Sequence, residues 1–147
     1  MPGKFNETLW NIGRKIEDEC LPLINRYFNA DFKRDDNIFD ILDFHDDTQK
    51  IICEIKGRTT NANKYKDTII PYNKVTAGFR KIEEGYRVYF IFCFKDKTME
   101  IELKEDTQFK VVLTGTNSIE HALIPITDLT LVEYPVPDFQ GGEEDEL

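Results

Sequence analysis

The stretch NIFDILDFHDDTQKIICEIKGR, residues 37–58, decides which fold and which chemistry this chain is expected to have. It contains two strand-like segments, 37–44 and 50–57, joined by HDDTQ, whose acidic and polar residues suit a turn. Residues two apart on a strand point to the same face, so Glu54 and Lys56 are expected to project together. A carboxylate and an ammonium on an otherwise apolar strand need partners or a ligand to offset their desolvation.

The returning chain would place Asp40 beside this pair. Two carboxylates and one lysine in a pocket suit a hard divalent metal and an activated water, which is phosphodiester chemistry. Asp43 points to the opposite face of a regular strand and ranks below Asp40, although a bulge would exchange their roles. The alternative is an ion pair between Glu54 and Lys56 on an edge strand, with Asp40 solvated.

Residues 7–28 have the apolar periodicity of an amphipathic helix that ends at Asn29. Glu17 falls inside the apolar stripe, which is an unusual place for a carboxylate. If this helix packs beside the two predicted strands, Glu17 can reach the same metal. The other interpretation is a glutamate that extends to the edge of a helix–sheet interface.

The order of these residues resembles the PD-(D/E)XK nuclease superfamily, in which an Asp, a spacer of about a dozen residues and a hydrophobic Glu-x-Lys strand follow one another. Asp40 and IICEIK, residues 51–56, fit that order, although Phe39 stands where the name of the superfamily has a proline. Archaeal Holliday junction resolvases are similar in layout, since a glutamate in an N-terminal helix precedes their motif. The resemblance covers residues 7 to 94.

The resemblance implies a Mg²⁺-dependent endonuclease that hydrolyses DNA, with Mn²⁺ able to substitute, and often a homodimer. The metal ligands would be Asp40, Glu54, Glu17 and the carbonyl of Ile55. Lys56 would hold the attacking water, stabilise the charge on the phosphate, or accept a proton, and these roles stay open. The fold implied is α/β, a mixed central sheet flanked by helices, with a core like that of restriction endonucleases.

The net charge of −9 disfavours a nucleic-acid partner, but its distribution does not. Residues 56–81 contain seven basic residues and one acidic residue. Local fields act over about 10 Å at ordinary salt, so this segment can attract a phosphate backbone. The commoner interpretation of such a run is a solvated loop and helix face. Apart from the catalytic lysine, the candidate backbone contacts are Arg58, Lys64, Lys66, Lys74, Arg80 and Lys81.

The rest of the chain predicts one α/β domain over residues 1–134 and a disordered acidic tail over residues 135–147. A polar, mobile stretch is expected at 61–70. Pro71 should open a second helix at 72–84, which Gly85 ends. Continuous apolarity makes 87–94 a central strand. Further strands are expected at 98–103, 109–113 and 129–134, with a short helix at 117–123.

Several classes of protein have no support in the sequence. No apolar run approaches the roughly 20 residues of a membrane span, and no secretory signal or nucleotide-binding motif is present. Three distant cysteines predict buried free thiols and an intracellular location. His45 and His121 are expected in a turn and on a helix surface. Two rival functions remain: a catalytically silent nucleic-acid-binding or assembly module, and an RNA-directed endonuclease.

Overall fold

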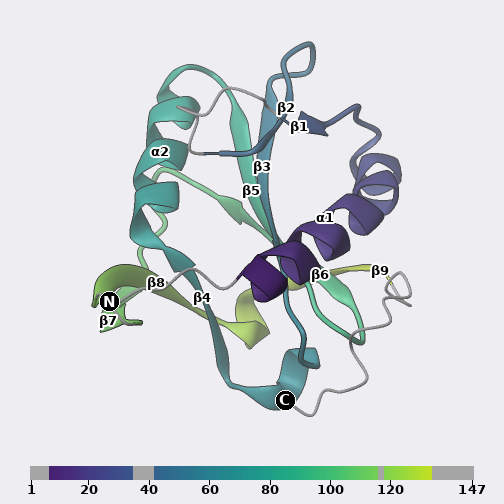
Figure 1. Cartoon of the computed structure of the whole chain (residues 1–147). Helices are drawn as coiled ribbons and strands as arrows, with labels where there is room; N and C mark the ends of the chain where they lie inside the picture. Colours follow the sequence, from purple (N-terminus) through teal and green to yellow (C-terminus); the bar gives the residue numbers. More distant parts are fainter. Residues whose placement is uncertain (1–6, 35–41, 116–117, 134–147) are drawn as a thin grey trace.

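The computed structural model describes residues 7–34, 42–115 and 118–133. Within these ranges, two helices lie on opposite faces of a six-stranded mixed sheet, α1 (Glu7–Phe28) on one face and α2 (Tyr72–Glu83) on the other (Figure 1). The predicted α/β class, with a mixed sheet flanked by helices, is therefore confirmed.

The main sheet has the strand order β1-β2-β3-β5-β6-β9. Only the central pair, β3 and β5, runs parallel among the described strands, and α2 lies on the connection between them. The strands are β1 (Lys33–Arg34), β2 (Phe44–Asp46), β3 (Ile51–Gly57), β5 (Arg87–Cys93), β6 (Thr98–Leu103) and β9 (Thr130–Glu133).

A second, antiparallel sheet of three strands lies on the same side as α2 (Figure 1). Its order is β4-β8-β7, and the short helical turns η1 and η2 flank it. The bounds of these elements are η1 (Ala62–Lys64), β4 (Asp67–Pro71), β7 (Lys110–Thr114), β8 (Ile119–Pro125) and η2 (Ile126–Asp128).

Alternation along β3 divides the interior into two cores. Cys53 and Ile55 pack in the core that contains Ile16, Cys20 and Ile24 of α1. These three α1 residues are four apart, which is the spacing of one helical face. The three cysteines of the chain are buried free thiols, as the sequence predicts.

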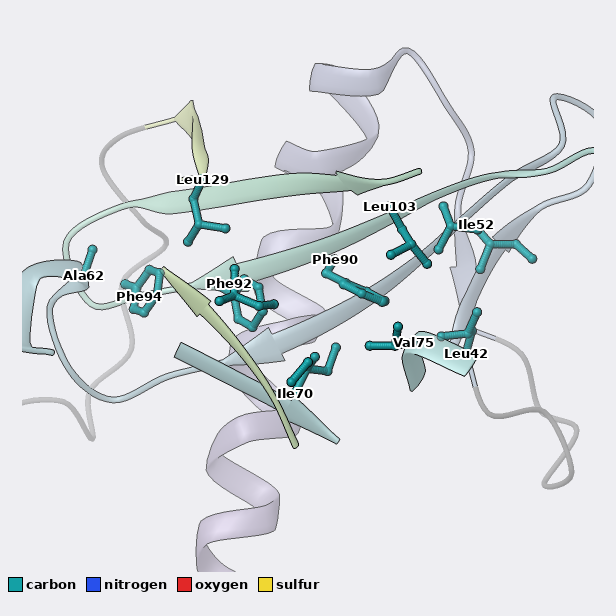
Figure 2. Packing of buried hydrophobic residues seen from close by; sticks show 13 residues of the cluster. Leu42, Ile52, Ala62, Ile70, Val75, Phe90, Phe92, Phe94, Leu103 and Leu129 are labelled. Atoms are coloured by element: carbon teal, nitrogen blue, oxygen red, sulfur yellow. The ribbon is translucent and has the colours of Figure 1, made fainter. Parts of the chain in front are cut away.

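The opposite core lies between the main sheet, α2 and the second sheet. Figure 2 shows Phe90 and Phe92 of β5 in the same cluster as Ile70 of β4 and Val75 of α2. Because β5 contributes to both cores and lies between β3 and β6, the prediction of a central strand covered on both faces is confirmed.

Gly57, at the end of β3, sets how closely α1 approaches the sheet. A Cβ atom at this position would lie 2.9 Å from Cβ of Ile16 and 3.0 Å from the carbonyl oxygen of Gly13. Both contacts are shorter than ordinary van der Waals separations, so only glycine permits this packing. The same contact brings the middle of α1 to the end of the Glu-x-Lys strand.

Helix predictions 7–28 and 72–84 are confirmed, with Pro71 at the start of α2 and Gly85 after its end at φ 96°. The strands predicted at 98–103, 109–113 and 129–134 are confirmed as β6, β7 and β9. The predictions next to β2 need correction. The turn after β2 occupies 47–50, so His45 belongs to β2, and part of the predicted strand at 37–44 lies outside the described residues.

Two predictions about the second sheet were wrong. The stretch 61–70, expected to be mobile, forms η1 and most of β4. The helix expected at 117–123 is instead β8, because Ala122 and Ile124 alternate into the core while β8 pairs with a strand on each side. The tail predicted at 135–147 lies outside the described residues.

A candidate active site around Glu54

Glu54 is a fully buried carboxylate that faces two lysines. Its side chain is 0% exposed, and Oε2 lies 3.2 Å from Nζ of Lys56 and 3.4 Å from Nζ of Lys74. Both are ion-pair distances, yet Oε2 accepts no aligned hydrogen bond from the described residues. The sequence predicted that Glu54 and Lys56 share a face, and α2 adds Lys74 from the next layer.

Burial raises the pKa of Glu54 above its usual value, while the positive charges of Lys56 and Lys74 lower it. Asp43 contributes in the raising direction, because its carboxylate repels a second negative charge nearby. The two ammonium groups therefore offset much of the desolvation that a buried carboxylate suffers.

Asp43, which the sequence ranks below Asp40, lies beside Glu54. Its backbone N–H donates a hydrogen bond to Oε1 of Glu54 at 3.2 Å. The register pairs Phe44 with Cys53, which sets Asp43 opposite Glu54 at the start of β2. The predicted ligand Asp40 lies outside the described residues. β2 begins at Phe44, so Asp43 precedes the strand, and its rank relative to Asp40 stays a prediction.

Glu17 of α1 lies within the electrostatic reach of the same group. Its side chain is 16% exposed, and Oε1 lies 3.5 Å from Nη2 of Arg34. Burial raises the pKa of Glu17 to about 7; the charges of Lys56 and Arg34 and a hydrogen bond from the backbone of Gly57 oppose this rise, and the charge of Glu54 adds to it. The structure thus brings three sequence-predicted residues into one neighbourhood: Glu17, Glu54 and Lys56.

Arg34, which the sequence analysis missed, links α1 to the strand side of the cluster. Its guanidinium donates to Oδ1 of Asp18 at 2.9 Å and lies 4.0 Å from Oδ2 of Asp43. The group also lies over the ring of Phe44, 4.5 Å from the centroid. No local motif indicates a role for Arg34, because its ion-pair partners are distant in sequence. Glu17 and Asp18 precede it by 16 or more residues, and Asp43 follows it by nine.

These oxygens are of the kind that Mg²⁺ prefers, and Oε2 of Glu54 has an acceptor position that no aligned donor fills. Among the described residues, however, no three His, Cys, Asp or Glu side chains lie close enough together to hold a metal ion. A divalent cation held here would bind through one or two carboxylates and keep its waters, and metal binding stays a prediction. Ligation by the carbonyl of Ile55 stays a prediction.

The predicted nucleic-acid contacts have different surroundings. Lys64, Lys66 and Arg80 are exposed. Lys81 lies 3.4 Å from Oε1 of Glu84, and Lys74 points at Glu54 rather than outward.

Arg58 is also not a simple surface residue. Its Nη2 donates to the carbonyl oxygen of Ile69 at 2.7 Å, and its Nε donates to Oγ1 of Thr68 at 3.4 Å.

Neither histidine lies where the sequence predicted it. His45 is half-buried in β2, and its Nε2 donates to the carbonyl oxygen of Leu42 at 2.9 Å. His121 lies in β8, at the wall of a cleft that Lys56 also lines.

Over the described ranges, neither helix combines the length and apolarity needed to cross a membrane.

Comparisons with protein-family models, with curated proteins and with solved structures return no match. The functional interpretation therefore depends on the geometry around Glu54 and on the resemblance of the motif.

Proposed function

We propose that this chain is a metal-dependent endonuclease that hydrolyses phosphodiester bonds in DNA. The observation that carries the proposal is the buried carboxylate of Glu54, within 3.4 Å of the two ammonium groups of Lys56 and Lys74. A purely structural carboxylate gains little from such burial, because desolvation costs about as much as the ion pairs return. A site that stabilises the negative charge developing on a phosphate needs positively charged groups held in place in this way.

The order of elements also supports a core like that of restriction endonucleases. A helix is followed by the antiparallel strands β1, β2 and β3, and α2 then leads to β5, which is parallel to β3. This is the layout that the resemblance to the PD-(D/E)XK superfamily implies. Glu54 and Lys56 lie on β3, one of the two central strands.

In the proposed reaction, Glu54 and an aspartate, Asp43 or Asp40, would hold Mg²⁺, and Glu17 would assist. The metal would supply positive charge at the phosphate and a more acidic bound water. Lys56, whose side chain is 25% exposed, is placed to contact the substrate and stabilise the charge that builds on the phosphate. Arg34 would keep Glu17 and Asp43 in position from outside the reacting groups.

The direct test is cleavage by the full chain. It is incubated with Mg²⁺, Mn²⁺ or a chelator and with linear, branched and single-stranded DNA and RNA. Glu54→Gln and Lys56→Ala should each reduce cleavage by a factor on the order of 100 or more while DNA binding remains. Lys104→Ala removes an exposed lysine that pairs with Glu102 elsewhere and should cut normally. Cutting by both site variants at the normal rate would refute the proposal.

The second candidate is a catalytically silent nucleic-acid-binding module on the same fold. It is favoured by the two lysines that already neutralise Glu54 and by the lack of a three-ligand cluster in the described part of the chain. Millimolar Mg²⁺ or Mn²⁺ should raise the melting temperature of a metal-binding enzyme and should not change that of the silent module.

The same protein sample answers two further questions. Cleavage of RNA but not DNA would identify the RNA-directed alternative. Homodimerisation, which the resemblance implies, predicts that the chain sediments with the mass of a dimer at the concentration used for cleavage.

A further inference from the structure

A cleft of about 560 Å³ opens beside the candidate active site. Its volume lies in the range of about 300–1,000 Å³ that is usual for pockets that bind small organic groups. Lys56 belongs both to the wall of the cleft and to the cluster around Glu54. A group bound in the cleft would therefore contact a residue of the candidate active site.

The walls combine an apolar surface with polar groups. Phe94, which is buried, and Ile69 and Ile126 supply apolar surface, while Asn61 and His121 supply groups able to form hydrogen bonds. A flat aromatic ring with polar edges, such as a nucleobase, matches this lining. A simple anion or an aliphatic chain would use only part of it.

Tyr65 provides an aromatic surface at the cleft. Tyr65 lines the cleft and is 63% exposed, so its ring is accessible to a bound group. Nζ of Lys64 lies 5.8 Å from the centroid of its ring. Exposed aromatic rings next to lysines are the surfaces on which proteins stack single-stranded bases.

Arg58 gives the same wall a positive charge. Among the described residues, no carboxylate lies within ion-pair distance of it, and it is held by Ile69 and Thr68 instead. Its guanidinium also lies 5.5 Å from the centroid of the Phe92 ring. The charge of Glu17 acts on Arg58 from beyond ion-pair distance, so the guanidinium can still attract an anion, and here the anion nearest to a bound base would be its own phosphate.

A second cleft continues beyond Tyr65. It has a volume of about 740 Å³, and its walls include Lys64, Lys66 and Lys110 as well as Asp67 and Asp128. The two clefts share Tyr65, Asp67 and Ile126, so they are neighbours. A nucleic-acid strand that leaves the first cleft would meet three lysines, which outnumber the two aspartates.

We propose that the cleft beside Lys56 binds an unpaired nucleobase of the substrate strand, stacked on Tyr65, so that the substrate is a nucleic acid with a single-stranded or opened segment at the cleavage position. This inference rests on the proposed function, because it places the base next to the phosphate that Lys56 would contact. It adds the class of substrate, which the cluster around Glu54 does not specify. A fully paired duplex cannot present a base to a cleft of this shape without opening.

The test measures binding of the full chain, in chelator, to four probes. They are a DNA duplex with a five-nucleotide single-stranded tail, the same duplex with an abasic tail, the fully paired duplex, and an RNA version of the first. The abasic tail keeps every phosphate and removes only the bases. The first probe should bind on the order of ten-fold more tightly than the abasic one. Equal affinity for the base-bearing and abasic probes would overturn the proposal. Tighter binding of the DNA tail or of the RNA tail identifies which nucleic acid the cleft prefers.

Two variants connect this preference to the cleft. Tyr65→Ala should abolish the difference between the base-bearing and abasic tails, and the matched control Tyr27→Ala, on α1 and 43% exposed, should keep it. Asn61→Trp should also abolish it by filling the cleft; Asn61 is exposed and makes no capping hydrogen bond, so this change should not unfold the chain. A preference that survives both cleft variants would place the base elsewhere and refute the assignment.

The outcomes separate this inference from the proposed function. Cleavage that is equally fast on paired, base-bearing and abasic DNA would refute the base site and leave the endonuclease intact. Selective binding of unpaired bases that Tyr65→Ala abolishes, without metal-dependent cleavage, would refute the endonuclease and leave the base site intact.

Discussion

The backbone amide of Asp43 donates a hydrogen bond to Oε1 of Glu54 at 3.2 Å, so the start of β2 holds the buried carboxylate of β3 in place. This contact does not use the side chain of Asp43. The Asp43 carboxylate instead faces Arg34, 4.0 Å from Nη1, and is available to a cation. The geometry thus separates the structural role of the Asp43 backbone from the chemical role that we propose for its side chain.

Asp43→Asn should therefore remove cleavage without removing the fold. The variant keeps the amide that holds Glu54 and loses one negative charge from the proposed metal-binding group. We expect cleavage with Mg²⁺ to fall by a factor on the order of 100 or more, with the melting temperature changed by only a few degrees. Steady-state cleavage and thermal denaturation measure the two effects.

Asp40→Asn is the matched control, because the sequence motif favours Asp40. Full activity of Asp40→Asn beside an inactive Asp43→Asn would assign the ligand to Asp43. The reverse result would restore Asp40 and leave Asp43 with only its backbone contact.

Gly57→Ala should destabilise the chain and weaken the site together. The added Cβ would lie 2.9 Å from Cβ of Ile16, so α1 must move away from the end of β3 and take Glu17 with it. We expect a loss of roughly 1–3 kcal/mol in the free energy of unfolding, measured in urea. The control is Gly13→Ala, in α1 about one turn before Ile16. The Cβ atom added there would meet nothing closer than Oε2 of Glu17 at 4.0 Å, so this change should be neutral or stabilising. Equal destabilisation by both would show that the close approach at Gly57 is unimportant.

The parts of the fold that periodicity determines were predictable. The helix at 7–28 follows from its own apolar stripe, and the strand at 87–94 from continuous apolarity, which requires cover on both faces. Both signals lie within the segment itself, so no tertiary contact was needed to interpret them.

Elements stabilised by distant partners were not predictable. β4 and β8 form because they pair with each other, Ile70 opposite Ala122, across about 50 residues of chain. Neither stretch is strongly apolar. In 61–70, three of the four residues before Tyr65 are polar, so the strand that begins only at Asp67 was not recognised.

The candidate site was predictable on β3 and uncertain elsewhere. Glu54 and Lys56 lie two apart on one strand, so their common face follows from local geometry. The position of Asp43 depends on where β2 begins, and a shift of one residue reverses the face of every side chain. Lys74 lies in a different layer, and its contact with Glu54 depends on the packing of α2 against the sheet.

The raised pKa of Glu17 predicts how stability depends on pH in the metal-free chain. The folded state binds this proton more tightly than the unfolded chain, so stability falls as pH rises from about 4.5 to about 7. Compared with Glu17→Gln, the wild type should lose up to about 3 kcal/mol over that range, measured by urea denaturation in chelator. Other titrating groups are common to both proteins and cancel in the difference. Parallel curves for the two proteins would show that Glu17 is solvated.

Salt dependence should distinguish the exposed lysines from Lys74. Replacing Lys64 and Lys66 together with glutamine should reduce the slope of log binding constant against log salt by about 2 for duplex DNA, because each phosphate contact contributes about 0.9. Lys74→Gln should leave that slope unchanged, since its ammonium lies 3.4 Å from Oε2 of Glu54, and should instead lower the free energy of unfolding by roughly 1–3 kcal/mol. Binding is measured in chelator, so that cleavage does not interfere. A slope reduced by Lys74→Gln as much as by a single exposed lysine would show that Lys74 contacts the nucleic acid rather than supporting the buried carboxylate.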